Sequence, residues 1–332
     1  MPLTILAESD ELPLSWTRAA LAVPRVQRVR LPLSGLTWLA YATVPANNDC
    51  RAFPHEDDHR ARVLLRGCPI GLAQRLARAG WETIRVGIEG VIDLAGENLH
   101  RRAVRKMARA AARFGRVSEI PWSPTAVARL RWLAREARHG QRPQLRFLFR
   151  TIFEPETRLF VFIDNDGLWQ GAILLTQPSP SVAVTELMLR RPHAPSGVME
   201  AIFAAAGAQL HAEGCQTLSL NEVPFRHLDH NLRPLERLIT LAGRRMAGVY
   251  DADGLYRFKA KFAPHWRPVY LCARPRLPLL ALVDLFTVSG CLELAASSFN
   301  RRQAAQRGQI GGAGARAART RATAQVAGGW GE

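Results

Sequence analysis

The spacing of apolar and polar residues changes several times along the second half of the chain, and each change marks a predicted element. In order, the pattern predicts a helix at 123–138, strands at 159–164, 168–176 and 181–190, a helix at 196–213, a strand at 216–221, a helix at 232–242 and a strand at 266–273. Ser123 and Ser196 are of the residue type that caps helix N-termini, and Asn165-Asp166-Gly167 is a typical hairpin turn.

The periodicity of the first half is weaker. Residues 69–79 predict a helix, and residues 82–94 predict strand material that Gly87 and Gly90 interrupt. A second, clearer helix is predicted at 97–114, where Val104, Met107, Ala111 and Phe114 form an apolar stripe at helical spacing.

The remaining faces of the 97–114 helix are strongly basic. They carry Arg101, Arg102, Arg105, Lys106, Arg109 and Arg113. Like charges four residues apart oppose a helix by roughly 0.2–0.5 kcal/mol each, so a purely structural helix would include acidic residues among them. We therefore predict that this face, extended by Arg135 and Arg138, is exposed and binds tRNA or anionic lipid with release of counterions. The alternative is a solvated face in a basic protein.

Charge supports a polyanionic partner for this part of the chain. The 332 residues have a net charge of +17, and residues 101–150 alone hold fourteen basic and two acidic side chains. Nucleic acid and an anionic membrane surface both fit such a block. Only Lys106, Lys259 and Lys261 are lysines among the 45 basic residues, so a lysine pair within three positions is unusual for this chain.

The ends of the chain and its cysteines favour a cytoplasmic protein. Residues 1–16 lack the basic start and apolar run of a signal peptide, and five cysteines without metal-ligand or redox spacing fit a reducing compartment. The histidines show no metal signature, so neither a metal nor a cofactor is expected. Residues 276–300 contain Asp284 and are too polar to span a bilayer, which leaves an interfacial helix with peripheral membrane contact or a helix packed on the domain. Residues 301–332 predict a disordered basic tail.

Three motifs carry a family resemblance. The segment from Gly254 to Leu271 resembles the signature G-L-x-x-F-K-x-K-F-x-P-x-W-x-P-x-Y-L that closes the cytosolic domain of phosphatidylglycerol lysyltransferases, the multiple peptide resistance factors. Residues 186–200 resemble the family's acid-Leu-Met-Arg strand and following helix start, and residues 87–94 resemble its G-E-E-A-x-V-D-L motif. The chain is similar to a stand-alone catalytic domain without the transmembrane half.

The resemblance implies a fold and a domain organisation. The order of elements is similar to that of Gcn5-related acetyltransferases, and the family implies two such folds in tandem, α/β (α+β) in class with mixed, mainly antiparallel sheets. We expect a diverged first domain at 1–122 and a second domain at 123–275, which carries the cleft where a strand splays from its neighbour. The loop that holds coenzyme A in this fold corresponds to residues 190–198, which contain two prolines and a single glycine. Coenzyme A is therefore not the expected donor.

The chemistry of ester exchange suggests the site residues. Transfer from aminoacyl-tRNA to a lipid hydroxyl needs a base for the acceptor proton and a cation for the oxyanion. We predict Lys259, Glu186 and Lys261 as catalytic, with Lys259 facing the cleft because positions two apart on a helix point in opposite directions. Substrate-binding candidates are Arg190, Arg191, Ser196, Gly197, Glu200, Asn221, Glu222 and Arg257.

Three functions stay open on the sequence. The first is an aminoacyltransferase that moves an amino acid from aminoacyl-tRNA to a lipid such as phosphatidylglycerol. The second keeps the fold but is an acyl-coenzyme-A-dependent N-acyltransferase. The third is a non-catalytic module that binds tRNA or membrane.

Overall fold

The computed structural model describes residues 11–46, 62–137, 140, 142–228, 231–245 and 251–298. The strands are β1 (Thr17–Ala19), β2 (Arg25–Arg30), β3 (Thr37–Pro45), β4 (Val63–Cys68), β5 (Glu82–Asp93), β6 (Gly115–Ile120), β7 (Arg158–Asp164), β8 (Trp169–Ser179), β9 (Val182–Arg190), β10 (Thr217–Pro224) and β11 (His265–Arg274). The helices are α2 (Ile70–Arg78), α3 (Arg102–Ala111), α4 (Pro124–Glu136), α5 (Val198–Ala212), α6 (Pro234–Arg245), α7 (Ala252–Ala260) and α8 (Leu279–Val288), followed by a helix at Cys291–Ser298. The tail predicted at 301–332 lies outside the described residues.

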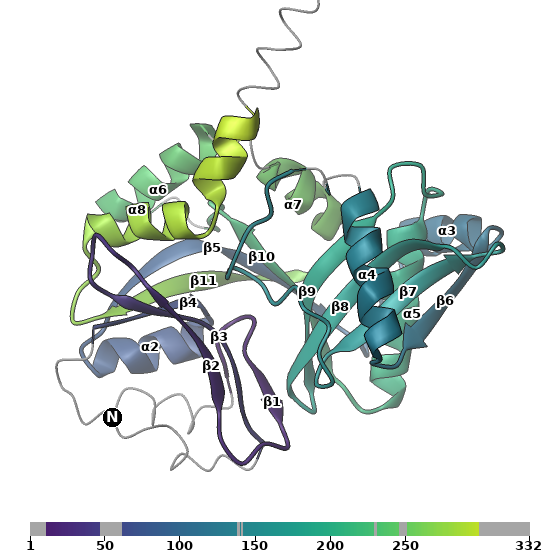
Figure 1. Ribbon diagram of the computed structural model, residues 1–332, viewed down its shortest axis with the longest axis horizontal. Coiled ribbons are helices and arrows are strands. Elements are labelled where there is room, and N and C mark those ends of the chain that lie inside the picture. Colours follow the sequence, from purple (N-terminus) through teal and green to yellow (C-terminus); the bar gives the residue numbers. More distant parts are fainter. Residues whose placement is uncertain are drawn as a thin grey trace, which may run out of the picture.

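All described strands belong to one mixed sheet. Its order is β1-β3-β4-β11-β5-β10-β9-β8-β7-β6, and β2 pairs with β3 at the edge of this path. The pairs β1–β3, β3–β4 and β9–β10 are parallel, and the others are antiparallel. The predicted α/β class with mainly antiparallel pairing is confirmed, and Figure 1 shows the sheet running through the whole molecule.

Segments from the two halves of the sequence are interleaved in this sheet. β11, from the end of the chain, lies between β4 and β5, and β6 pairs with β7 at the far edge. α3 also packs on α5. The expected division between 1–122 and 123–275 stays a prediction. In the sheet, however, β11 from the second segment pairs with β4 and β5 of the first, and β6 from the first segment pairs with β7 of the second.

The second half of the sheet is covered by helices on both faces. Phe160 and Phe162 of β7 point to the core beneath α5 and α3, whereas Leu159 and Val161 point to the core beneath α4. α3 and α4 therefore lie on opposite faces of the sheet. The expectation that Arg135 of α4 extends the basic surface of α3 is wrong for this reason, and Arg138 lies outside the described residues.

Most elements predicted for the second half are confirmed, with shifted ends. Ser123 caps α4, since its hydroxyl accepts a hydrogen bond from the Ala126 amide at 3.1 Å. Ser196 does not cap α5: the N-cap is Gly197, with φ of 91°, a value that favours glycine. α3 begins at Arg102 rather than at 97, and β5 runs unbroken through Gly87. The patterns did not predict β1, β2, β3, β4 or β6.

α8 is fixed to the first half of the sheet by one buried carboxylate. Asp284 is 1% exposed and accepts hydrogen bonds from the amides of Leu33 and Ser34 and from the Ser34 hydroxyl at 2.7 Å. Among the described residues no single helix is long and apolar enough to span a bilayer. α8 and the helix at Cys291–Ser298 reach that length and composition only together, across a 66° bend.

Replacement of Asp284 by alanine is expected to lower the free energy of unfolding by about 2–4 kcal/mol, because two amides and a hydroxyl lose their acceptor in a buried place. Denaturant unfolding of the full chain measures this. Glu293→Ala is the control, since the ion pair of Glu293 with Arg146 is exposed and is expected to contribute less than about 1 kcal/mol. Equal losses for the two variants would contradict an anchoring role for Asp284.

Candidate active site

The candidate site lies where β9 and β10 separate. The two strands pair in parallel only from Thr217 to Ser219, opposite Val182 to Val184, and β10 then continues against β5. Beyond this point the Asn221 side chain bridges the gap by donating to the carbonyl of Thr185 at 2.8 Å. This is the splayed pair that the order of elements predicts.

A bulge in β10 turns two consecutive carbonyl groups toward α7. The register with β5 shifts between Ser219 and Glu222, and Asn221 has φ of 64°, which asparagine tolerates better than most residues. The Lys259 Nζ donates to the Asn221 carbonyl at 2.9 Å and to the Glu222 carbonyl at 2.8 Å. Lys259 is 2% exposed.

Burial changes the chemistry of the Lys259 amine. It lowers the pKa of Lys259 from 10.5 to about 7, although the negative charges of Glu222 and Glu89 favour the protonated form. A neutral amine has two N–H donors, and both have acceptors in the carbonyls of Asn221 and Glu222. Its lone pair is then left to accept a proton. The arrangement suits a general base that works near neutral pH.

Two carboxylates act on this amine, and one of them pairs with a guanidinium. Glu222 is 1% exposed and forms an ion pair with Arg66 of β4 at 2.6 Å. Burial raises the pKa of Glu89, while a hydrogen bond from Ser219 and the charges of Arg267 and Lys259 act in the opposite direction. The centre of the sheet therefore holds a buried polar cluster drawn from β4, β5, β10 and α7.

Two of the three sequence motifs, 87–94 and 254–271, meet at this cluster. A Cβ atom at Gly87 would lie 2.7 Å from both Glu222 Oε1 and the Val223 carbonyl, so only glycine leaves room for that carboxylate. A Cβ atom at Gly90 would lie 3.0 Å from Pro264 and 3.1 Å from Trp266 of the closing signature. The glycines that interrupt the apolar pattern of β5 in the sequence are thus sites of close approach.

α7 separates its two lysines as predicted. Phe262 is buried and packs against Phe203 of α5, with ring centroids 5.2 Å apart, and Phe258 also contacts this core. Lys261 lies on the other side, where its side chain is 50% exposed and pairs with Glu200 at 2.9 Å. Only Lys259 reaches the centre of the sheet.

Few of the candidates near the start of α5 point into the site. Arg191 stacks on Trp132 of α4, with its guanidinium 4.4 Å from the ring centroid, and Arg190 donates to the Ala194 carbonyl. Ser196 is exposed. Gly197 lies against α3, since a Cβ atom there would be 2.0 Å from the Met107 carbonyl.

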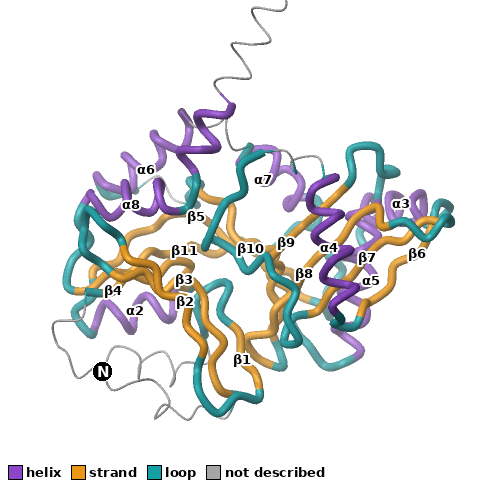
Figure 2. The backbone as a smooth tube through the Cα atoms, in the orientation of Figure 1, coloured by secondary structure: helices purple, strands orange, loops and turns teal. Residues whose placement is uncertain are grey.

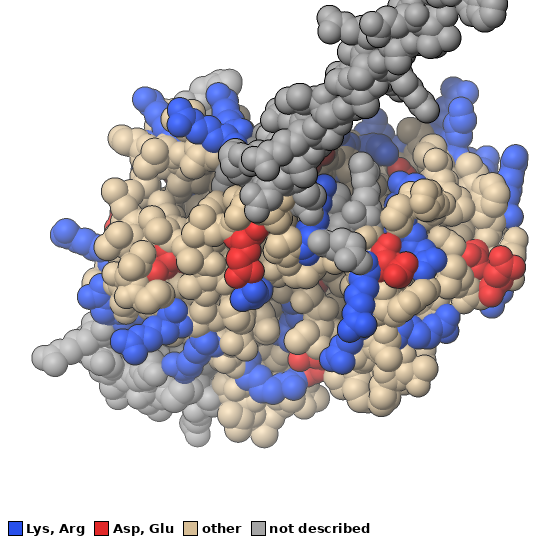
Figure 3. Space-filling view, turned by 45° about the horizontal axis from the view of Figure 1, so that its top comes forward, with Lys and Arg blue, Asp and Glu red and all other residues tan. Residues whose placement is uncertain are grey.

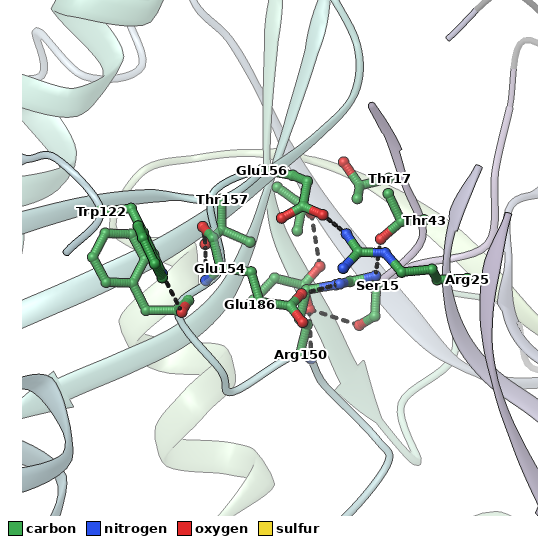
Figure 4. A network of polar contacts seen from close by, with 12 residues as sticks. Ser15, Thr17, Arg25, Thr43, Trp122, Arg150, Glu154, Glu156, Thr157 and Glu186 are labelled. Atoms are coloured by element: carbon green, nitrogen blue, oxygen red, sulfur yellow. Dashed lines mark hydrogen bonds and ion pairs between the residues drawn. The ribbon is translucent and has the colours of Figure 1, made fainter. Parts of the chain in front are cut away.

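Glu186 belongs to a different buried network (Figure 4). Its carboxylate accepts hydrogen bonds from the Ser15 hydroxyl at 2.7 Å, the Thr176 hydroxyl at 2.8 Å and the Arg150 amide at 3.1 Å. Arg150 in turn donates to Thr43 of β3 at 3.1 Å and pairs with Glu154. Burial raises the pKa of Glu186, which these hydrogen bonds partly offset. The network joins the two halves of the sheet and is not in contact with the Lys259 amine.

The remaining predicted residues lie on the surface. All six basic candidates of the 97–114 segment are exposed, from Arg101 to Arg113, and so is Arg257 of α7. The sequence did not indicate Glu89, Arg66 or Ser219 as site residues. A signal for Glu89 existed, because it is one of only two carboxylates in the otherwise apolar motif at 87–94.

Comparison with known proteins agrees with this arrangement. Residues 51–273 match the family model described as the C-terminal domain of phosphatidylglycerol lysyltransferase. The chain belongs to this family.

Individual members of the lysyltransferase family are distant from this chain. The phosphatidylglycerol lysyltransferase of Bacillus subtilis is 29% identical over 104 residues, which are 31% of this chain and 12% of that protein. The lysylphosphatidylglycerol biosynthesis bifunctional protein LysX of Rhodococcus opacus is 26% identical over 212 residues, or 59% of this chain and 19% of that protein. The chain thus spans less than a fifth of the length of these two relatives.

A solved structure shows the same fold. The structure of L-PGS from Bacillus licheniformis superposes with a TM-score of 0.61 at 17% identity, covering 87% of this chain and 92% of that one. This chain therefore shares the arrangement of its elements with that protein.

The lowered pKa of Lys259 predicts a pH dependence of stability. Above about pH 7 the folded protein releases the Lys259 proton, whereas the unfolded chain keeps it up to pH 10.5. The unfolded state then binds more protons, so Lys259 makes stability rise with pH across this window, by up to about 1.4 kcal/mol per pH unit. Lys259→Met removes this contribution.

Denaturant unfolding of both proteins at several pH values tests this prediction. The difference in unfolding free energy between wild type and Lys259→Met is expected to change in favour of the wild type as pH rises above 7. A difference that does not vary with pH would mean that the Lys259 amine keeps its ordinary pKa.

Proposed function

We propose that this chain transfers an aminoacyl group from aminoacyl-tRNA to a hydroxyl of a lipid such as phosphatidylglycerol. The observation that supports this most directly is the buried Lys259 amine at the splayed pair β9–β10, inside the region that matches the lysyltransferase family. The names of the relatives describe lysyl transfer and lysylphosphatidylglycerol synthesis, which is this class of reaction.

The reaction exchanges one ester for another. The Lys259 amine takes the proton of the acceptor hydroxyl as its oxygen attacks the ester carbonyl carbon of the aminoacyl group. The tetrahedral intermediate then collapses, the bond to the ribose oxygen of the tRNA breaks, and the proton passes from Lys259 to that leaving oxygen. Since the donor ester is already activated, holding the two substrates together supplies much of the remaining rate.

The start of α5 argues against coenzyme A as the donor. In acetyltransferases of this fold a diphosphate binds at that helix end, but here α3 packs against Gly197. The first turn of α5 also contains Glu200, which is 5% exposed and already paired with Lys261. A diphosphate would meet this carboxylate instead of free amide groups.

The exposed basic face of α3 is the part of the surface that we assign to the tRNA. Four of the six cations lie on α3, and Arg101 and Arg113 flank it. α3 packs against the start of α5, which is the strand-to-helix end of the splayed pair. Phosphate groups of an acceptor stem bound there would relieve the repulsion among these cations.

Lys259→Met is expected to lower the single-turnover rate of transfer from aminoacyl-tRNA by about 10²–10⁴-fold, the usual contribution of a general base. In the wild type this rate should rise with pH up to about 7 and then level off, because only the neutral amine accepts a proton. Lys259→Arg should be inactive as well, since a guanidinium stays protonated.

Lys261→Ala, at the C-cap of the same helix, is the matched control. Its half-exposed pair with Glu200 contributes little, and transfer should stay within about threefold of the wild type. Near-normal turnover of folded Lys259→Met at saturating aminoacyl-tRNA would refute the assignment of the base. Transfer that requires acetyl-coenzyme A and not aminoacyl-tRNA would refute the proposed donor.

Charge reversal on α3 tests the tRNA surface. Arg105→Glu with Arg109→Glu should weaken tRNA binding at least about tenfold at low salt. The slope of binding against salt concentration should also fall by about one for each phosphate that the protein no longer neutralises. Filter binding or fluorescence anisotropy over a range of salt concentrations measures both quantities.

The control makes the same change of charge on β2, where Arg28 and Arg30 are also exposed. If Arg28→Glu with Arg30→Glu weakens tRNA binding as much as the α3 variant, the effect comes from net charge and α3 is only a solvated face.

A further inference from the structure

Five large apolar side chains are exposed on α6 and α8, the two helices that pack on β5 and β11. They are Leu238 and Leu241 of α6 and Leu279, Leu280 and Val283 of α8, each between 49% and 59% exposed. Single exposed apolar residues are common on protein surfaces, but groups of them mark interaction sites. We call these five residues the leucine surface.

The two helices present this surface on the same side of the sheet. Ile239 of α6 and Ala281 of α8 are buried in one hydrophobic core with Ile84 of β5 and Leu271 of β11. Figures 1 and 2 show both helices over this part of the sheet. Their exposed sides therefore face away from the sheet in a common direction.

α8 cannot turn the leucine surface inward without losing its anchor. Asp284 lies next to this surface, four residues after Leu280, on the buried edge of the helix, where it accepts the hydrogen bonds from residues 33 and 34 described above. Leu33, which is 55% exposed, lies beside this anchor. The buried carboxylate thus fixes the rotation of α8 with its apolar residues outward.

The exposed charges of α6 and of the residue that leads into α8 are all basic. Arg237, Arg244 and Arg245 of α6 are exposed, and so is Arg276 just before α8. The only carboxylates of these two helices are Glu236 and Asp284, and both are buried, with Glu236 paired to Arg85 at 3.0 Å. Figure 3 shows basic side chains at the upper left of the molecule, next to uncharged surface.

We infer that the leucine surface and its arginines dock the protein on an anionic lipid bilayer. The leucines enter the boundary between headgroups and acyl chains, and the guanidinium groups bind lipid phosphates. A second copy of the chain would bring like-charged arginines together, and a nucleic acid would leave the leucines in water. The inference rests on the proposed function in one respect, since it supposes a lipid acceptor within the membrane.

Binding to vesicles of phosphatidylglycerol and phosphatidylcholine, measured by co-sedimentation of the full chain, tests the inference. Leu280→Glu with Val283→Glu should weaken binding about tenfold or more. The control, Val23→Glu with Ile152→Glu, adds the same charge at exposed apolar residues elsewhere and should change binding less than about twofold. Replacing Arg237, Arg244 and Arg245 by glutamine should cost about fivefold per arginine at low salt, with phosphatidylcholine binding little changed.

Two further measurements separate this inference from the proposed function. The α8 double variant should lose transfer to lipid in vesicles but keep transfer to a short-chain phosphatidylglycerol that is dissolved as monomers. Loss of both would point to a damaged site rather than a lost docking surface and would overturn the inference. Unchanged vesicle binding of the variant would overturn it too. If the wild type is a dimer, the variant is a monomer and both bind vesicles equally, the leucine surface is instead the contact with a second copy of the chain.

Discussion

The site depends on one buried amine that the protein must satisfy without water. Lys259 has only two consecutive carbonyl groups, those of Asn221 and Glu222, as direct hydrogen-bond acceptors among the described residues, and these are accessible because β10 bulges there. The bulge in turn requires an asparagine at positive φ, and the Glu222 side chain requires Gly87 on the neighbouring strand. Burying an amine without hydrogen-bond partners costs free energy of folding, so the loss of any one of these features is expected to destabilise the others. The same burial gives the amine a pKa in the range where proton transfer works best.

Two buried networks have different tasks in this sheet. The cluster around Lys259 draws residues from β4, β5, β10 and α7 and leaves a proton acceptor at the splay of β9 and β10. The network around Glu186 and Arg150 satisfies its carboxylate with three donors and ties β3 and the N-terminal segment to β8 and β9. A buried carboxylate on the right strand of the fold is therefore not sufficient evidence for a catalytic role. The hydrogen-bond partners of the carboxylate distinguish a catalytic role from a structural one.

Local signals explain how much the sequence could predict. The elements after Ser123 have caps, turns and clear periods, and α7 lies where the sequence analysis expected Lys259 to be part of a helix. β3 and β4 were not predicted because they are buried on both faces, so they read as apolar runs without alternation. The cluster itself joins Arg66, Glu89, Glu222 and Lys259, which are far apart along the chain. A local sequence pattern does not predict which charged side chains of different buried strands will lie next to one another.

The position of β11 has a consequence for how the molecule is made. β11 fills the place between β4 and β5, although β5 ends at Asp93 and β11 begins only at His265. During synthesis the edges of β4 and β5 that pair with β11 stay unpaired until residue 274 has left the ribosome. α7 is synthesised just before β11. Pairing of strands this far apart in sequence is slow, because the entropy of loop closure is lost before the strands form their stabilising contacts. The Lys259 amine and the strand that completes the sheet therefore leave the ribosome together, so a shorter nascent chain contains neither the buried amine nor the completed sheet around it.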